Sequence, residues 1–382
     1  MARWLHRSLA DATGERQNRL TDNELQAMDP VAESVRPSTL GSLWALIEDV
    51  WSATRSYDEV RSSLPPERFV EVGGRQLYVE QAGRGEPLLL LHGFCCSSYS
   101  WRAVVPALSR RHRVLNVDLP GFGYSERPQD PSEYTIPAYG EVLLELLDRL
   151  GVEECHLMGH SFGGALAVWL AARHSERFRS LTLVDSALPE YMDEQRQLWA
   201  RFRPLNYLLL HGLFLSRSSV RKDLETCYYD DSLVTDELVE EYRSRLLVEG
   251  VEEAFFGFMA PSDDWTCEAS LEAIEIPSLV IWGAQDEVIT LERARRELAR
   301  LPEGRFVIFQ RCGHAPMEEL PKRFLGAVLP FLAAARHRPL VERLRGWLRR
   351  ARWPRKLPEA AVGGSARLLR SARLLRSARL LH

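Results

Sequence analysis

Long apolar segments are missing from this sequence of 382 residues. A helix needs roughly 20 consecutive apolar residues to cross a bilayer, and no segment approaches that length. The N-terminus carries Arg3 and Arg7 but no apolar run after them, so a secretory signal is not expected. We therefore expect a cytoplasmic protein that is soluble or bound peripherally to a membrane, and its 45% hydrophobic residues suffice for a substantial core.

Metal-ligand and disulfide patterns are missing as well. The six cysteines show no C-x-x-C spacing, and Cys95 and Cys96 are adjacent, which suits neither a zinc site nor a disulfide framework. This cysteine usage is typical of a reducing compartment. The sequence thus indicates neither a metal nor an organic cofactor.

Charge of either sign is nearly balanced over the whole chain, but its distribution is uneven. The net charge is −4, whereas residues 336–382 carry fourteen Lys/Arg against two acids, a local charge of +12. The remaining residues therefore carry −16. Because the body is acidic and no base-reading motif accompanies the basic tail, nucleic-acid binding is not expected.

The sequence does contain short β-rich runs that alternate with helical patterns. Two such runs around Gly73-Gly74 predict a hairpin, and Leu88 to Leu91 is typical of a buried parallel strand. The segments predicted as strands are 68–72, 76–80, 88–91, 114–117, 155–158, 181–185, 278–282 and 305–309. Helical spacing follows at 142–150, after Ser161, near 290–300 and from Pro321. These units predict an α/β fold, a mostly parallel, doubly wound sheet covered by helices on both faces.

The alternation stops after about residue 188 and resumes near residue 268, which predicts an inserted helical cap. The chain then divides into an N-terminal extension (1–66), a core (67–188 and 268–335), a cap (189–267) and a basic, low-complexity tail (336–382). The apolar cap residues either wall a substrate pocket or form the cap's own core; they are Leu208, Leu209, Leu210, Leu213, Phe214 and Phe255.

The N-terminal extension contains an amphipathic helical pattern. Its apolar residues fall on one helical face and are Leu40, Leu43, Trp44, Ile47 and Trp51. Two interpretations stay open for this helix, packing on the domain surface and contact with a membrane or a partner.

The stretch around Ser161 has the spacing Gly159-x-Ser161-x-Gly163, between a predicted strand and a predicted helix. This is the pattern of a nucleophile elbow, a turn so sharp that the serine is held in a strained backbone conformation. Glycines are needed on both sides because a Cβ there would collide with the neighbouring strand and helix. The turn exposes the hydroxyl and places the Phe162 N–H at a helix N-terminus, where it can face developing negative charge.

A serine hydroxyl is a weak nucleophile until a base takes its proton, and a third group must orient that base. Asp286 and His314 each follow a late predicted strand, so the chain order is Ser161, Asp286, His314. This is the order of a triad built on an elbow of this kind. Two other acids remain open for the third position, namely Asp185 after the preceding strand and Glu287 next to Asp286.

Four motifs together resemble the α/β-hydrolase superfamily, in its esterase-like group with a helical cap. They are Leu91-His92-Gly93-Phe94 with Trp101 beyond it, Asp118-Leu119-Pro120-Gly121-Phe122-Gly123, Gly159-His160-Ser161-Phe162-Gly163-Gly164, and Gly313-His314. The resemblance spans residues 69 to 331 or so and leaves both ends of the chain outside. It implies Ser161 as nucleophile, His314 as general base and acid, and Asp286 as the group that holds the imidazole.

The same resemblance implies an oxyanion hole made by the backbone N–H groups of Phe94 and Phe162. It gives His92 a structural hydrogen bond below the oxyanion loop, and His160 a packing role beside the elbow. Cys95 and Cys96 depart from the small residues that usually follow the His-Gly pair, so they either crowd the acyl pocket or simply pack.

Serine at the elbow points to an acyl–enzyme, whereas relatives with a carboxylate there form alkyl–enzyme esters. We expect a serine hydrolase that cleaves a carboxylic ester, or a related acyl bond, of a small and largely apolar substrate. The alternatives are carbon–carbon bond hydrolysis, lactone opening, acyl transfer to another alcohol, and small-molecule binding without turnover. The sequence predicts neither the acyl length nor the leaving group nor the oligomeric state.

The basic tail contains a second amphipathic pattern. Its apolar residues share one helical face and are Leu340, Val341, Leu344, Trp347, Leu348 and Ala351. A basic amphipathic helix with tryptophan is typical of binding to an anionic membrane surface, which predicts peripheral membrane contact. The other interpretation is a solvated helix folded on the acidic body. The repeat Ser-Ala-Arg-Leu-Leu-Arg that starts at Ser365 does not match the helical period of 3.6, and it predicts low complexity.

Overall fold

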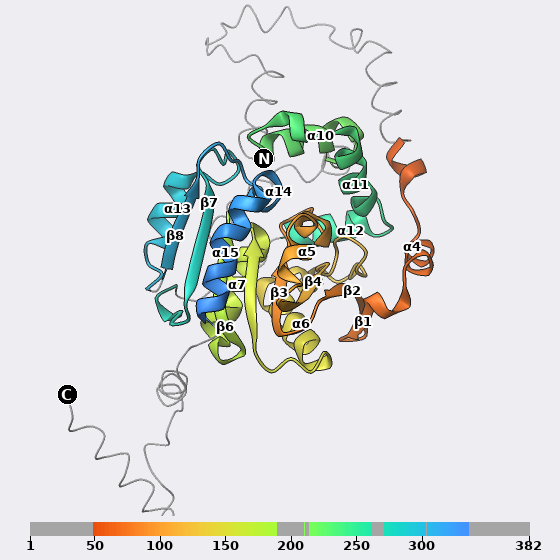
Figure 1. Cartoon of the computed structure of the whole chain (residues 1–382). Coiled ribbons are helices and arrows are strands. Elements are labelled where there is room, and N and C mark those ends of the chain that lie inside the picture. The colour runs from red at the N-terminus through yellow and green to blue at the C-terminus, as the bar shows by residue number, and fades with distance from the viewer. Residues whose placement is uncertain (1–48, 189–209, 211–213, 261–270, 303, 336–382) are drawn as a thin grey trace, which may run out of the picture. The chain divides into compact units, whose positions relative to one another are not determined.

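Figure 1 shows the computed structural model of the chain, which describes residues 49–188, 210, 214–260, 271–302 and 304–335. Within these residues eight strands form one sheet in the order β1-β2-β4-β3-β5-β6-β7-β8. The strands are β1 Phe69–Val72, β2 Arg75–Ala82, β3 Glu86–Leu91, β4 His112–Val117, β5 Cys155–His160, β6 Phe178–Val184, β7 Ser278–Gly283 and β8 Gly304–Phe309. β2 runs antiparallel to β1 and β4, and all other neighbours are parallel. The predicted α/β sheet and its hairpin are confirmed.

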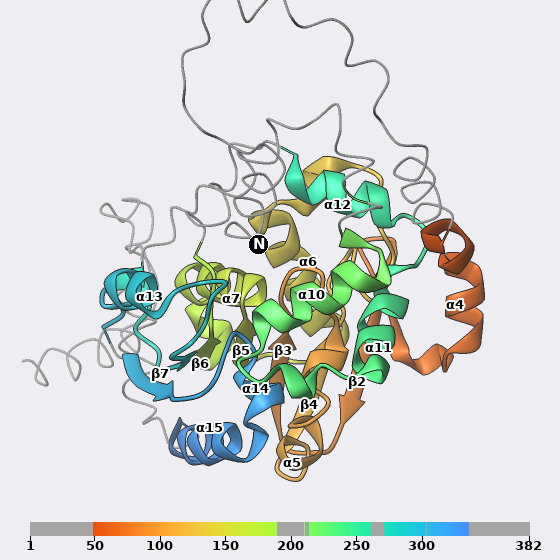
Figure 2. The ribbon, with the colours of Figure 1, turned by 90° about the horizontal axis from the view of Figure 1, so that it is seen from above.

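Helices cover both faces of the sheet, as Figure 2 shows. They are α5 Val105–Leu108, α6 Ile136–Arg149, α7 Phe162–Arg173, α13 Leu291–Leu298, α14 Pro316–Glu319 and α15 Pro321–Ala335. The four leucines of β3 are fully buried and alternate between two cores. Leu89 and Leu91 pack with α6 and α7, whereas Leu88 and Leu90 pack with α5 and α15. Burial on both faces explains why this strand is an uninterrupted apolar run.

Most elements differ from the predicted ranges by a few residues at one or both ends, and two of these differences bear on the site or on the packing around it. α6 begins at Ile136 instead of 142, because the Thr135 side chain accepts the Ala138 N–H and a proline occupies the first turn. β6 ends at Val184, one residue earlier than predicted. Asp185 therefore lies outside the strand, with a positive φ of 39°.

The described part of the predicted cap is helical. It contains α10 Arg217–Cys227, α11 Asp236–Leu246 and α12 Val251–Met259. Figure 1 shows α10 and α11 above the sheet. Phe214 and Phe255 belong to the larger apolar core and also line a cavity, while Leu210 is fully buried in that core. Leu208, Leu209 and Leu213 lie outside the described residues.

Most of the predicted N-terminal helix also lies outside the described residues. At its end, residues 49–53 are helical, but Val50 is fully buried and Trp51 is 55% exposed. The other four residues of the predicted face lie outside the described residues, so both interpretations of this helix stay predictions. The extension continues through α4 Tyr57–Ser63. Before α4, the Arg55 N–H donates to the carbonyl of Leu247, beside the end of α11.

No helix of the described residues is long and apolar enough to cross a membrane. The predicted tail helix and its repeats lie outside the described residues. Membrane contact by the tail therefore stays a prediction.

Candidate active site

Ser161 occupies the turn between β5 and α7 with φ 50° and ψ −117°, a backbone conformation that residues other than glycine rarely adopt. Both flanking glycines are sterically required. A Cβ on Gly159 would lie 2.2 Å from the Gly163 carbonyl oxygen, and one on Gly163 would lie 2.4 Å from the Leu91 carbonyl oxygen. The sequence pattern at this turn therefore corresponds to a close approach of three chain segments.

His314 and Asp286 are paired. His314 Nδ1 lies 2.8 Å from Asp286 Oδ2, and both side chains are buried. The other carboxylate oxygen, Oδ1, accepts the backbone N–H groups of Val288 and Ile289 at 2.8 and 2.9 Å. These bonds orient the carboxylate so that one oxygen faces the imidazole, and the Nδ1–H tautomer leaves Nε2 as a base.

The main chain of His314 is fixed by the cap and by the elbow. Its N–H donates to the Cys227 carbonyl at the end of α10, at 2.6 Å. Its carbonyl oxygen lies 2.7 Å from His160 Nε2, so the His160 ring donates this hydrogen bond. Gly313 must be glycine because a Cβ there would lie 2.4 Å from the Cys227 carbonyl oxygen.

The two other motif histidines are buried and neutral. His92 Nδ1 lies 2.7 Å from the Gly93 carbonyl, and its Nε2 accepts the Leu119 N–H at 2.9 Å. Burial lowers the pKa of His92 to about 4. Burial, followed by the charge of the adjacent His314, lowers the pKa of His160 well below its ordinary value. His92 thus makes the predicted structural hydrogen bonds, and His160 does more than pack, because it holds the His314 carbonyl.

Phe94 and Phe162 meet on one cap residue, Phe258 of α12. The Phe94 ring stacks on Phe258 with centroids 4.3 Å apart, and the Phe162 ring meets it edge-on at 4.8 Å. Phe162 begins α7, so its N–H lies at the positive end of the helix dipole. A Cβ on Gly93 would lie 3.1 Å from Ser161 Cβ, so the loop before Phe94 lies directly beside the elbow.

A cavity of about 170 Å³ opens onto Ser161 and His314. Its other lining residues come from core and cap and include Phe94, Cys95, Cys96, Phe214, Asp223, Cys227 and Glu318. None of the described lining residues is a lysine or an arginine. Burial raises the pKa of the Cys95 and Cys96 thiols, which are therefore neutral walls of the cavity. A second cavity of about 120 Å³ shares several of these residues and extends toward Phe255 of α12.

The two alternative acids are placed differently. Glu287 is exposed at the surface. Asp185 is fully buried, and its Oδ1 accepts the Gly283 N–H at 2.9 Å. A hydrogen bond between Asp185 and the imidazole is not observed, whereas Asp286 has one.

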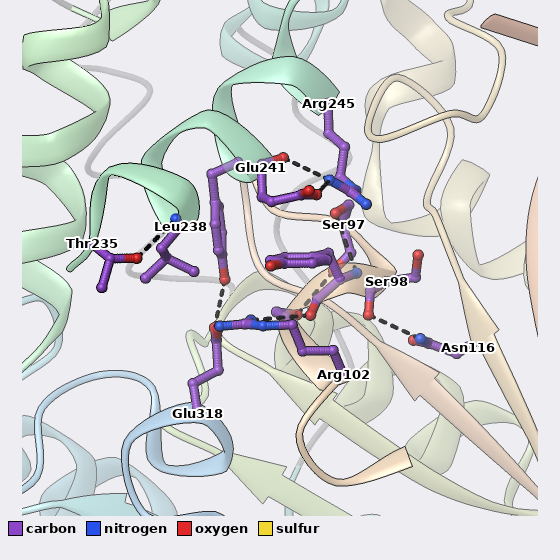
Figure 3. A network of polar contacts seen from close by, with 12 residues as sticks. Ser97, Ser98, Arg102, Asn116, Thr235, Leu238, Glu241, Arg245 and Glu318 are labelled. Atoms are coloured by element: carbon purple, nitrogen blue, oxygen red, sulfur yellow. Dashed lines mark hydrogen bonds and ion pairs between the residues drawn. The ribbon is translucent and has the colours of Figure 1, made fainter. Parts of the chain in front are cut away.

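Sequence reasoning missed a polar network beside this cavity, which Figure 3 shows. Glu318 of α14 pairs with Arg102, and its Oε1 accepts the Tyr242 hydroxyl of α11 at 2.5 Å. Arg102 and Arg245 lie over the Tyr99 ring, 4.2 and 4.3 Å from its centroid. The network joins the cap to the segment that follows His314. Its signal in the sequence is faint, since Glu318 follows the Gly313-His314 motif without any further pattern.

Two sets of side chains in the described part of the chain could offer metal ligands. One is Asp185, Asp286 and His314, and the other is Glu86, His112 and His156 at the opposite ends of the strands. Arg179 Nη1 lies 2.6 Å from Glu86 Oε1 and already supplies a cation to the second set. Neither set indicates a cofactor.

Comparison with known proteins covers the segment that carries these residues. The family model for the alpha/beta hydrolase fold matches residues 86–321. A 2-hydroxymuconate semialdehyde hydrolase of a Pseudomonas species is 32% identical over 282 residues, which cover 70% of this chain and 94% of the relative. A pimeloyl-(acyl-carrier protein) methyl ester esterase of Aeromonas hydrophila is 30% identical over 263 residues, which cover 66% of this chain and 98% of the relative.

Solved structures agree with this match. A meta-cleavage product hydrolase from Pseudomonas fluorescens superimposes with a TM-score of 0.59 and 28% identity. The superposition covers 70% of this chain and 97% of that one.

Proposed function

The chain belongs to the α/β-hydrolase family and is a hydrolase, and we propose that it cleaves carboxylic esters of small, largely apolar substrates through an acyl–enzyme. One observation carries the proposal. Ser161 in its elbow conformation and the Asp286-bound His314 line the same cavity. A serine, a base and an orienting carboxylate are the groups that acyl transfer requires.

In the proposed mechanism, His314 Nε2 takes the proton of Ser161 as its Oγ attacks the ester carbonyl. The oxyanion that forms accepts the N–H groups of Phe94 and Phe162, one from the oxyanion loop and one from the start of α7. His314 then gives its proton to the leaving alcohol, and the acyl–enzyme is released when water attacks in the same way. In acylation and in deacylation, Asp286 stabilises the imidazolium of His314 and accepts the hydrogen bond of its Nδ1–H.

The charge of the cavity supports a neutral substrate. Among the described residues that line it, Asp223 and Glu318 are acidic and none is a lysine or an arginine. Glu318 is paired with Arg102. Burial raises the pKa of Asp223 to about 7. A carboxylate substrate would meet this acid in the cavity that holds Ser161, whereas an uncharged acyl chain fits the phenylalanine and cysteine walls.

Carbon–carbon bond hydrolysis is the second candidate, because the Pseudomonas relative at 32% identity is named for a muconate semialdehyde. The muconate in that name is a carboxylate. The cavity that holds Ser161 offers no lysine or arginine among its described residues, and a cation, Arg127, lines the adjoining cavity of about 120 Å³. Lactone opening and acyl transfer to another alcohol use the same acyl–enzyme and differ only in the group that leaves or accepts.

The test is a panel of p-nitrophenyl esters from acetyl to dodecanoyl, measured on the parent and on Ser161→Ala. We expect turnover that depends on chain length, and a loss of at least about 10⁴-fold in kcat for the variant, because the hydroxyl is the nucleophile. A fluorophosphonate should label the parent at Ser161 and leave the variant unlabelled.

The same preparations should be offered a 2-hydroxy-6-oxo-dienoate as the carbon–carbon bond substrate. Faster turnover of the dienoate than of every ester would replace the proposal by the second candidate. Absence of both turnover and labelling would show that Ser161 is not activated, and would leave binding without catalysis.

A further inference from the structure

A second buried carboxyl group lies beside the Asp286–His314 pair. Asp185 follows β6 and is fully buried. Its Oδ1 accepts the Gly283 N–H at 2.9 Å, while its Oδ2 has no hydrogen-bond partner among the described residues. A carboxyl oxygen of Asp185, one of Asp286 and a ring nitrogen of His314 all lie within 4.8 Å of one another. Nothing in the proposed mechanism uses this group.

Two carboxylates this close together in a buried site cannot both carry a charge. Asp286 accepts hydrogen bonds from His314, Val288 and Ile289, all of which favour its ionised form. Asp185 accepts only the one from Gly283. The shared proton therefore belongs on Asp185. Burial, and next the charge of Asp286, raises the pKa of Asp185 well above its ordinary value.

We propose that Asp185 is a protonated positioning residue that donates its O–H to the Asp286 carboxylate. The proposal rests on the proposed function, in which Asp286 orients His314. A donor on Asp286 fixes the carboxylate and lowers its basicity, so that the imidazolium of His314 holds its proton less tightly and returns it to the leaving alcohol. Without the donor, the Asp286 carboxylate would stabilise the imidazolium of His314 more strongly and would be free to rotate away from the ring.

Titratable groups from several segments face Asp185. They are Asp286 after β7, Cys312 and His314 after β8, and Glu319 in α14. The charges of Asp286 and Glu319 both oppose ionisation of Asp185. Burial keeps the Cys312 thiol neutral by raising its pKa. The neutral form of Asp185 is thus favoured from every side except that of a protonated His314.

The first test compares Asp185→Ala with Asp185→Asn on a p-nitrophenyl ester that the parent hydrolyses. Asparagine keeps an oxygen for the Gly283 N–H and offers an N–H donor to Asp286, whereas alanine offers neither. We expect Asp185→Ala to lower kcat by at least about tenfold and to move the acid limb of kcat/KM to higher pH. Asp185→Asn should restore most of kcat and return the limb to the parent's midpoint.

The direction in which the acid limb of kcat/KM moves in Asp185→Asn shows whether Asp185 is protonated in the parent. If Asp185 were ionised in the parent, asparagine would remove a negative charge beside His314 and lower the pKa of the imidazole. The acid limb would then move to lower pH in the asparagine variant, and the proposal would be overturned.

The second test does not depend on activity. Below the ordinary aspartate pKa of about 3.9, residue 185 is protonated in both the folded and the unfolded chain. Above it, the unfolded parent loses the proton while the buried native group keeps it. The unfolding constant of the parent should therefore grow relative to that of Asp185→Asn by about tenfold per pH unit. Urea midpoints between pH 4 and pH 8 measure this difference, and a gap that stays constant over that range would contradict the proposal.

These outcomes separate the inference from the function on which it rests. If no preparation hydrolyses an ester, the urea series still shows whether Asp185 holds a proton, and only the proposed function fails. If Asp185→Asn is inactive while Asp286→Asn is active, Asp185 is itself the acid of the triad and the positioning role is wrong.

Discussion

His160 shows how much one residue of the elbow contributes beyond its packing. Its ring donates to the His314 carbonyl at 2.7 Å, and the two ring centroids are 4.9 Å apart. Because His160 and His92 have lowered pKa values and stay neutral, neither of them should contribute to the acid limb of the pH–rate profile.

His160→Leu should lower kcat between tenfold and about 100-fold, because a buried carbonyl loses its donor and His314 shifts relative to Ser161. His160→Gln keeps an N–H donor and is the matched control. Ester turnover of the two variants, at equal folded fraction by circular dichroism, checks the prediction. Equal losses in both would mean that only the shape of the imidazole matters.

Asp286 carries a second prediction at this scale. Asp286→Asn should lower kcat on the order of 10⁴-fold, because an amide cannot stabilise the imidazolium and favours the wrong tautomer of His314. Glu287→Gln, at the exposed neighbouring position, should change kcat less than about twofold. Steady-state kinetics of both variants on one ester measure these effects. A large loss of kcat in Glu287→Gln instead would make Glu287 the acid of the triad.

The residues named from the sequence and those missed differ in the kind of contact they make. Ser161, Asp286 and His314 could be proposed because each follows a strand, and parallel strands bring such positions to one edge of the sheet. The bond from the His314 N–H to the Cys227 carbonyl could not be proposed, because it joins the core to a cap helix far away in the chain. Asp185 was predicted only as a rival acid, since burial and its lone hydrogen bond appear only once β6 and β7 are paired.

At the scale of elements, α12 contacts from the cap side the two segments that carry the proposed oxyanion donors, Phe94 and Phe162. Phe258 is fully buried and touches the rings of Phe94, Phe122 and Phe162. Phe258→Ala should lower the free energy of unfolding by about 3 to 5 kcal/mol, since it opens a cavity in the core.

The same substitution should also lower kcat more than it raises KM, because the displaced loop carries the Phe94 N–H, the proposed oxyanion donor of the transition state. Phe258→Leu keeps most of the volume and is the control. Urea unfolding and ester kinetics on both variants measure these effects. Full activity of a folded Phe258→Ala would show that the cap does not support the oxyanion hole.

The contact between α14 and α11 gives another prediction. Glu318→Gln should destabilise the fold on the order of 2 kcal/mol, because Arg102 loses its carboxylate partner and the Tyr242 hydroxyl loses a charged acceptor. Tyr242→Phe removes only one of these bonds and should cost less. Thermal unfolding of the two variants compares them. A larger loss for Tyr242→Phe would place the energy in the hydrogen bond of the Tyr242 hydroxyl and not in the ion pair.

Element prediction from the sequence succeeded where periodicity was decisive. The buried strands read as apolar runs, and the turn at Gly73-Gly74, with φ 58° and 78°, is marked by its glycines. The start of α6 was missed although Ile136 and Tyr139 are buried there, because Pro137 and Gly140 are poor helix formers and interrupt the pattern. The cap could be located only as an interruption, since its helices are defined by contacts with the core.

On the scale of the whole molecule, the extension and the cap interact near the end of α11. Arg55 pairs with Val248 as an isolated bridge, and Asp49 Oδ2 lies 2.6 Å from Arg243 Nη2. No local pattern in the sequence could predict this contact, because it joins the extension to cap residues about 190 positions later in the chain. The division into extension, core, cap and tail therefore stays a prediction in its boundaries.

The uneven charge of the chain leads to the last prediction, which concerns the tail. Residues 336–382 carry +12 and an amphipathic pattern with Trp347, and basic residues near an anionic surface contribute about 1 kcal/mol each. The full chain should therefore bind vesicles that contain phosphatidylserine, and binding should weaken as salt screens the charges.

Deletion of 336–382 should abolish vesicle binding and leave turnover of a water-soluble ester intact. Replacement of Arg343, Arg345 and Arg349 by glutamine keeps the apolar face and should weaken binding in proportion to the charge removed. Vesicle binding that survives the deletion would assign membrane contact to another segment, and lost turnover would show that the tail folds on the acidic body.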